Sequence, residues 1–274
     1  MRWHTPYVRV RVGCECVYVA EVATHAVLQV EPRLERGVRA IEERWTNEPE
    51  LGLSRYVDVF GNLCRRTTIP AGQSTLRYDG VLDVPGLADW QQYGAIEVPP
   101  QDLPDEALVF TLPSRYCPSD QLADAAWALF GGVPPGWQRV QAICDWVHQS
   151  VTFGYGSSTP MTTAADVFES RTGVCRDFAH LAVTLCRALN IPARYVFGYL
   201  PDIGIPPVDE PMDFVAWMEV FLEGGWWTFD PRNNQPRIGR VLIARGRDAL
   251  DVAMVSTFGG PKLQSMTVWA DEVT

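Results

Sequence analysis

The sequence predicts an α+β protein with two parts, a β-rich domain over residues 1–112 and a mixed domain over residues 113–274. Short runs rich in Val, Tyr and Thr, separated by turn residues, fill the first domain. Apolar residues at helical spacing first occur beyond Pro113, and strand patterns return after them. We therefore expect a β-sandwich-like domain, followed by helices packed on an antiparallel sheet.

The strand patterns of the first domain alternate loosely between apolar and polar residues. They end at turn signals such as Gly61-Asn62, a dipeptide typical of a hairpin. The expected strands cover residues 7–19, 24–30, 39–45, 56–60, 63–69 and 76–84. The stretch that follows, residues 85–104, carries many turn residues, so we expect it to cross the surface as a connection.

The second domain mixes helical and strand patterns. Ser119 is a candidate cap for its first helix, and Thr163 for a later short one. Helices are expected over residues 120–130, 137–150 and 164–168 and from Cys175 onward; strands are expected over 151–155, 193–200, 214–222 and 226–229. Gly224-Gly225 joins the last two strands as a hairpin, and one more strand is expected near the end. Residues 201–211 are rich in Pro and acids, and are long enough to overhang a site.

The helix that opens at Cys175 is the most informative element. Apolar residues recur along one face and predict a buried amphipathic helix: Phe178, Ala182, Leu185, Cys186 and Leu189. Asn190 and Pro192 then end it. Cys175 therefore lies in the first turn, where free backbone N–H groups and the positive end of the helix dipole favour a thiolate or an oxyanion. The alternative is a buried cysteine that only packs.

Composition excludes several functions. The 274 residues carry a net charge of −10 and are 47% apolar. An acidic surface repels phosphate and anionic lipid, so we expect no nucleic-acid or membrane partner. No segment resembles a secretory signal or a membrane span, and seven scattered cysteines favour a reducing cytoplasm. Cys14 and Cys16 are expected to pack, because no second pair completes a metal site. With no phosphate loop or acidic calcium loop, we expect no cofactor or metal.

Several motifs of the second domain resemble the bacterial transglutaminase-like superfamily. They are residues 173–181 (GVCRDFAHL), 187–196 (RALNIPARYV), 216–220 (AWMEV) and 226–231 (WWTFDP). The segment at 58–62 (DVFGN) is similar to a domain that often precedes this core. The resemblance implies a papain-like fold and a Cys, His, Asp triad in that chain order. It also implies a cysteine that attacks an amide or ester carbonyl and passes the acyl group to water or an amine.

Two triad positions carry over onto this sequence. Cys175 matches the nucleophile, and Asp230, at the end of a hairpin strand, matches the carboxylate that orients the histidine. From the residues alone, Asp230 is equally well read as a turn former before Pro231. The third position does not match, because Val215 stands where the family has histidine. Valine cannot accept a proton, and acid–base help contributes about 10²–10⁴ in rate.

No other residue is an obvious replacement base. His180 follows Cys175 on the opposite side of the same helix, so we expect it to pack rather than react. His148 ends the helix before the loop of the site, and His4 and His25 lie in the β domain. Other residues expected in the cleft, which the sequence does not rank, are Tyr155, Tyr199, Asp213 and Trp217.

Three functions fit this pattern. The first is a thiol enzyme with altered chemistry, which acts on an acyl group of a peptide or small molecule through Cys175 and Asp230. The second is a non-catalytic relative that keeps the cleft for binding, with Trp217, Trp226 and Trp227 suited to an apolar or peptide ligand. The third is an ordinary hydrolase in which the histidine was replaced deliberately. The substrate and the oligomeric state are not readable from the sequence.

Overall fold

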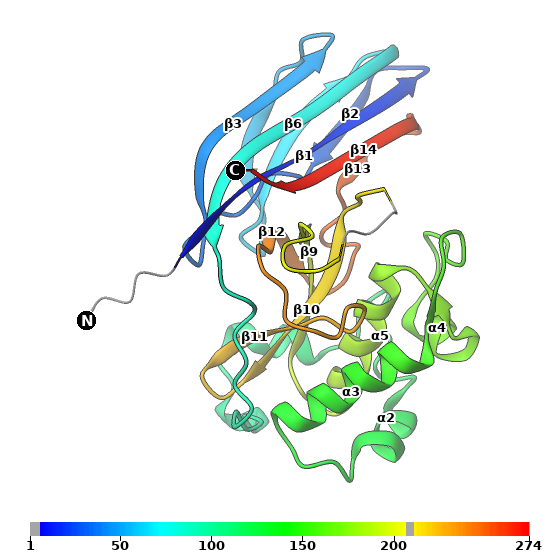
Figure 1. Cartoon of the computed structure of the whole chain (residues 1–274). Helices are drawn as coiled ribbons and strands as arrows, with labels where there is room; N and C mark the ends of the chain where they lie inside the picture. The colour runs from blue at the N-terminus through cyan, green and yellow to red at the C-terminus, as the bar shows by residue number, and fades with distance from the viewer. Residues whose placement is uncertain (1–5, 207–210, 274) are drawn as a thin grey trace.

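The computed structural model describes residues 6–206 and 211–273 and has two halves. One half is built from β strands alone, and in the other half helices cover a sheet. Figure 1 shows the β half at the top, with the helices gathered at the other end of the molecule. The mixed α+β class expected from the sequence is confirmed.

Two four-stranded antiparallel sheets form the β half, with strand orders β14-β1-β6-β3 and β13-β2-β5-β4. Alternate residues of β1, β2, β5 and β6 meet between the sheets in a buried cluster that includes Cys16, Leu28, Ile69 and Leu76. The pair of sheets is therefore a sandwich. The strands are β1 (Tyr7–Ala20), β2 (Thr24–Leu28), β3 (Arg39–Glu48), β4 (Ser54–Val57), β5 (Leu63–Ile69), β6 (Gly72–Pro85), β13 (Val255–Thr257) and β14 (Lys262–Glu272).

The last two strands of the chain belong to this sandwich. β14 pairs with β1 from Val10↔Glu272 to Val19↔Lys262, and β13 pairs with β2. Figure 1 shows β14 beside β1. The expected division into residues 1–112 and 113–274 therefore differs from the two halves of the structure, because β13 and β14 belong to the sandwich. Pairing between strands so far apart in the chain leaves no local signal in the sequence.

A third four-stranded sheet, ordered β11-β10-β9-β12, forms the other half together with the helices. Its strands are β9 (Ala193–Tyr199), β10 (Val215–Leu222), β11 (Gly225–Phe229) and β12 (Val241–Gly246). The α helices are α1 (Asp105–Leu108), α2 (Ala123–Phe130), α3 (Trp137–Ser150), α4 (Ala164–Ser170) and α5 (Cys175–Ala188). Two short 3₁₀ helices (Pro100–Asp102 and Val109–Thr111) and the pair β7 (Thr152–Phe153) and β8 (Thr172–Gly173) complete the elements.

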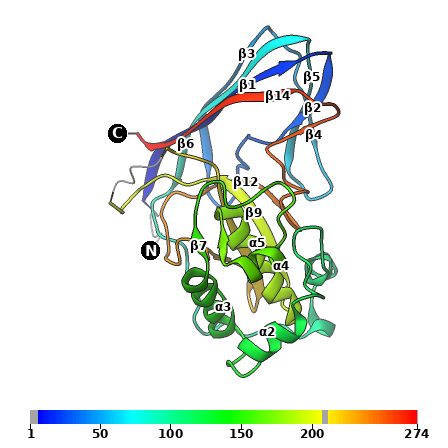
Figure 2. The same ribbon diagram turned by 90° about the vertical axis from the view of Figure 1, so that its right-hand side faces the viewer.

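The long helix α5 packs on β9 and β10 and is buried along almost its whole length. Its apolar face meets α3 and β10 in one cluster, which includes Val140, Leu181, Leu185 and Met218. Figure 2 shows α3, α4 and α5 together below the sandwich. One helix boundary differs from expectation, because Ser119 lies in a turn and α2 begins at Ala123.

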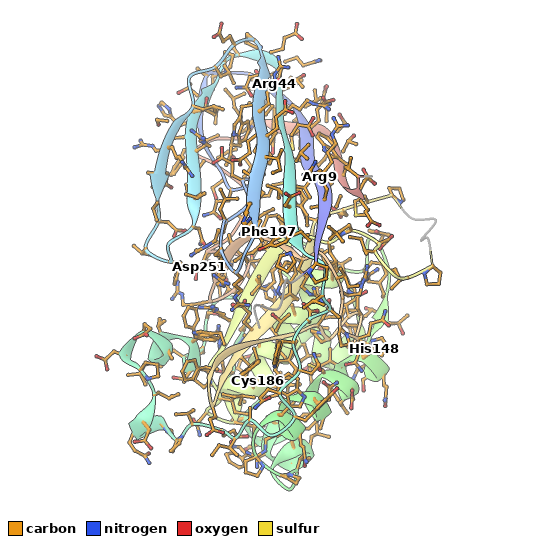
Figure 3. All side chains as sticks on the ribbon, turned by 60° about the vertical axis from the view of Figure 1, so that its left-hand side comes forward. Arg9, Arg44, His148, Cys186, Phe197 and Asp251 are labelled. Atoms are coloured by element: carbon orange, nitrogen blue, oxygen red, sulfur yellow. The ribbon has the colours of Figure 1, made fainter. Side chains whose placement is uncertain are left out.

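The two halves share a second core. Val10 and Val12 of β1 and Tyr78 of β6 pack with residues of β9 and β12, such as Phe197 and Ile243. The sheet that carries the candidate site is therefore held between the helices and the sandwich. In Figure 3 the label of Phe197 marks this junction.

Candidate active site

Cys175 is the first residue of α5, as its sequence context predicts. The carboxylate of Asp177 accepts a hydrogen bond of 2.8 Å from the backbone N–H of Val174, directly before the cysteine. Gly173 makes this turn possible, because a Cβ there would lie 2.7 Å from the Cβ of Asp177. The start of the helix is thus fixed by one carboxylate and one glycine.

The sulfur of Cys175 lies against the edge of β10. Its Sγ is 3.8 Å from the carbonyl oxygen of Phe214, and the backbone N–H of Ala216 also faces it. β11 pairs with β10 only between Met218 and Leu222, so the first turn of α5 occupies the edge that β11 leaves uncovered. The thiol therefore lies beside Val215, the position at which the resemblance expects histidine.

Cys175 borders an open cavity of about 660 Å³. Val215, Tyr155 and Asp213 line the same cavity, as does His148 at the end of α3. Apolar side chains form much of the remaining wall, among them Phe153, Phe178, Leu200, Ile205, Met212 and Phe214. The charged groups of the wall are Asp202, Asp213, Arg232 and Arg237. The cavity has room for a peptide segment or a small organic molecule.

Burial controls the protonation of the thiol. It raises the pKa of Cys175 to about 11, with the negative charge of Asp213 acting in the same direction. The backbone N–H groups of Ala216 and Arg176 and the charge of Arg232 oppose the rise without cancelling it. This direction is opposite to the effect expected from a helix N-terminus. At neutral pH the thiol is therefore protonated, and a reaction through sulfur needs a proton acceptor.

Asp230 is buried at the end of β11 and is already well partnered. It accepts hydrogen bonds from the backbone N–H of Asn233 (2.9 Å), the side-chain amide of Asn233 (2.8 Å) and Arg240 (2.8 Å). Burial alone would raise the pKa of Asp230, but the charge of Arg240 and these hydrogen bonds lower it overall. Asp230 borders a separate cavity of about 40 Å³ rather than the cavity of Cys175. A carboxylate has about four acceptor sites, so one remains.

Two residues expected in the cleft lie elsewhere. Tyr199 is fully buried toward the sandwich, where its hydroxyl donates to the carbonyl oxygen of Val30 at 2.9 Å. Trp217 is buried with Val196 and Leu242, and the guanidinium of Arg240 lies over its ring. Strand alternation indicates which residues share a face, but not which layer covers that face.

The other two expected residues do border the cavity. Tyr155 is 61% exposed and its ring meets that of Phe153 edge-on. Asp213 accepts a hydrogen bond of 2.7 Å from the backbone N–H of Phe214. Removal of water around its carboxylate raises the pKa of Asp213 above its usual value.

The histidines lie in different parts of the molecule. His180 is buried and stacks on Tyr116, and its Nε2 accepts a hydrogen bond from the backbone N–H of Ala249. His25 lies on β2 beside Thr68, and His4 lies outside the described residues. His148 is the histidine, among those described, that reaches the cavity of Cys175. Its sequence signal was weak, since it was only one of several polar residues at the end of a helix that precedes a loop.

Neither a metal centre nor a membrane span was found in the described part of the chain. Residues 6–206 and 211–273 contain no group of three or more His, Cys, Asp or Glu side chains placed to hold a metal ion. No helix in the same ranges is long and apolar enough to cross a membrane.

A cysteine at the start of a buried helix, beside a sheet and an open cavity, defines a site of the cysteine-nucleophile type. A model of the transglutaminase-like superfamily matches residues 124–231, which include Cys175, Val215 and Asp230. A solved structure from Cytophaga hutchinsonii, named a putative cysteine protease, is 30% identical, with a TM-score of 0.88. The match covers 98% of this chain and 92% of that one. The chain therefore belongs to the transglutaminase-like superfamily.

Two mycobacterial relatives extend this similarity over most of the chain. An uncharacterized protein of Mycobacterium leprae is 26% identical over 259 residues, covering 89% of this chain and 91% of that protein. An uncharacterized protein of Mycobacterium tuberculosis strain H37Rv is 29% identical over 248 residues, covering 81% and 77%. Their names assign no reaction.

Proposed function

We propose that this protein is a thiol enzyme that acts on an acyl group, an ester or amide of a peptide or small molecule, through Cys175. The observation that carries the proposal is the position of the thiol. Cys175 lies at the start of α5 and borders a cavity of about 660 Å³. Backbone N–H groups beside the sulfur are suited to stabilise an oxyanion on the attacked carbonyl.

The chemistry differs from that of a complete triad. Val215 supplies no base, and the resting thiol is protonated because burial raises its pKa to about 11. Activated acyl groups with good leaving groups are therefore favoured over unactivated amides. The apolar wall favours an uncharged acyl chain. The cytoplasmic location and the lack of nucleic-acid or membrane partners remain proposals that rest on composition.

Trapping an acyl adduct by intact-protein mass spectrometry tests this function. A panel of activated esters, thioesters and amides with short apolar acyl chains is offered to the wild type and to Cys175→Ser. We expect a mass increase equal to the acyl group on the wild type and none on the variant. Equal labelling of both proteins, or no labelling with any ester, would contradict the proposal.

A second function is supported by the same two features that weaken catalysis. With valine in place of histidine and a protonated thiol, the cavity is equally suited to bind an acyl-containing ligand without turnover. Binding of the panel compounds is then expected to be the same in the wild type and in Cys175→Ser, by calorimetry, with no adduct in either protein. Adduct formation that depends on Cys175 would exclude this alternative.

A further inference from the structure

A second reactive side chain lines the cavity of Cys175. His148 lies in the last turn of α3 and is exposed at the cavity wall, whereas the triad position beside the sulfur carries Val215. In Figure 3 the label of His148 lies at the side of the helical half, while that of Cys186 lies within it. The site therefore has an imidazole, but it comes from a helix rather than from β10.

The orientation of this imidazole is set by the loop after β11. Nδ1 of His148 lies 2.8 Å from the carbonyl oxygen of Arg232. A carbonyl oxygen only accepts, so in the neutral ring Nδ1 carries the proton and Nε2 is the basic nitrogen. A backbone carbonyl behind a histidine orients the ring in the way a carboxylate does in a triad. Arg232 is itself held by its guanidinium over the ring of Phe153, another wall residue.

We propose that His148 is the general base of the reaction at Cys175, and this inference rests on the function proposed above. In the first step the proton of the thiol passes through one water to Nε2, and sulfur forms a bond to the acyl carbon. The bond from carbon to the leaving oxygen then breaks, and His148 returns the proton to that oxygen. In the second step His148 takes a proton from water as the water attacks, the S–C bond breaks and sulfur regains a proton.

The rest of the cavity suits this role. Its other titratable side chains include Asp202, which is paired with Arg237, and Asp213, whose carboxylate faces the backbone N–H of Phe214. His148 and Cys175 line one cavity, and general bases act either directly or through one water. With a base on α3, the site retains a group for acid–base chemistry even though position 215 of β10 has a hydrocarbon side chain.

Substitution of His148 with chemical rescue tests the proposal. The rate at which an activated ester acylates Cys175 is measured for the wild type, His148→Gln and His148→Ala, with and without added imidazole. We expect both variants to react about tenfold or more slowly, and imidazole to raise the rate of His148→Ala. His25→Gln is the matched control, because His25 is also exposed and has a hydrogen bond at Nδ1, but lies on the sandwich.

Each outcome is decisive. Variant rates within twofold of the wild type, or a slow His148→Ala that imidazole does not accelerate, would overturn the role of His148. Absence of acylation in the wild type would instead overturn the proposed function itself. Urea unfolding of each variant accompanies the kinetics, and His148→Gln, which keeps the size and polarity of the side chain, distinguishes loss of the base from loss of structure.

Discussion

At the scale of single residues, the site combines a cysteine at the position that matches the nucleophile of the family with an altered neighbour, Val215. Cys175 is the first residue of α5. Asp230 is buried, and the charge of Arg240 and the hydrogen bonds from Asn233 lower its pKa and so favour the ionised carboxylate. Val215 has a hydrocarbon side chain, so it can neither accept the thiol proton nor donate a hydrogen bond to a carboxylate. The resulting thiol is accessible from the cavity but protonated at neutral pH.

The first prediction concerns the protonation of this thiol. Because the pKa of Cys175 is raised to about 11, the alkylation rate by iodoacetamide should rise about tenfold per pH unit well beyond pH 9. The rate is followed by mass spectrometry, and Cys175→Ser gives the blank for the six other cysteines, all of which are buried. A plateau below pH 8.5 would show instead that the start of α5 stabilises a thiolate.

The second prediction concerns the triad position. Val215→His places an imidazole beside Cys175, at the position where the resemblance expects the histidine of the triad. Ester hydrolysis should increase about a hundredfold, measured as kcat/KM. Val215→Gln is the control for a polar side chain without basicity and should give no comparable gain. If Val215→His leaves the rate unchanged, Asp230 and the surrounding groups are not arranged to support a complete triad.

At the scale of elements, the contact between α5 and β10 makes the site. The helix begins at a turn that Gly173 and Asp177 fix, and its first residue occupies the strand edge that β11 leaves uncovered. α3 contributes to the same cavity from the other side through His148. Three elements that are separate in the chain, α5, β10 and α3, thus contribute side chains to the cavity.

The third prediction tests the turn before α5. Gly173→Ala would bring a Cβ to 2.7 Å from Asp177 Cβ, so the turn and the sulfur must shift. We expect a loss of roughly 1–3 kcal/mol in the free energy of unfolding, measured with urea, and an altered alkylation rate at Cys175. Gly94→Ala serves as the control, since its added Cβ meets nothing within 4 Å. Equal stability of the two variants would mean that the turn adapts freely.

At the scale of the whole molecule, a buried carboxylate joins the two halves. Glu219 of β10 forms ion pairs with Arg194 of β9 (2.6 Å) and Arg245 of β12 (2.7 Å). It also pairs with Arg36, which precedes β3 of the sandwich (3.1 Å). Asn62 adds a second link, because its side chain exchanges two hydrogen bonds with the backbone of Arg245. The sheet that carries the site is thereby fixed to the sandwich by charge as well as by packing.

The fourth prediction follows from this ion-pair cluster. Burial opposes ionisation of Glu219, but its arginine partners lower the pKa to about 2, from 4.5. A depressed pKa in the folded state gives stability that is complete above pH 4.5 and is lost as the pH falls toward 2. Glu219→Gln should lose roughly 3–5 kcal/mol at neutral pH, measured with urea, and should show less further loss on acidification. Glu223→Gln, an exposed neighbour, is the control, and an equal effect of the two substitutions would contradict this role.

Local patterns in the sequence predicted much of the second half. The helix over residues 137–150, the helix that begins at Cys175 and the hairpin at Gly224-Gly225 all occur in the structure. Periodicity and turn residues are sufficient for such elements because the signals lie within a few residues of one another. The family was likewise identified correctly from short motifs around Cys175 and Asp230.

What the sequence could not predict depends on distant contacts. His148 meets the carbonyl of Arg232 across 84 positions of the chain, and no spacing rule connects them. Tyr199 faces the sandwich because Val30 of a remote segment covers it. The rise in the pKa of Cys175 likewise follows from the packing around it, which outweighs the effect of the helix end.

The pairing of β1 with β14 has a consequence for biosynthesis. The second strand neighbour of β1 lies at residues 262–272, so one sheet of the sandwich remains incomplete until those residues have left the ribosome. The elements around Cys175 are all translated earlier. Nascent chains of this protein therefore expose one edge of β1 until residues 262–272 have been synthesised and can pair with it.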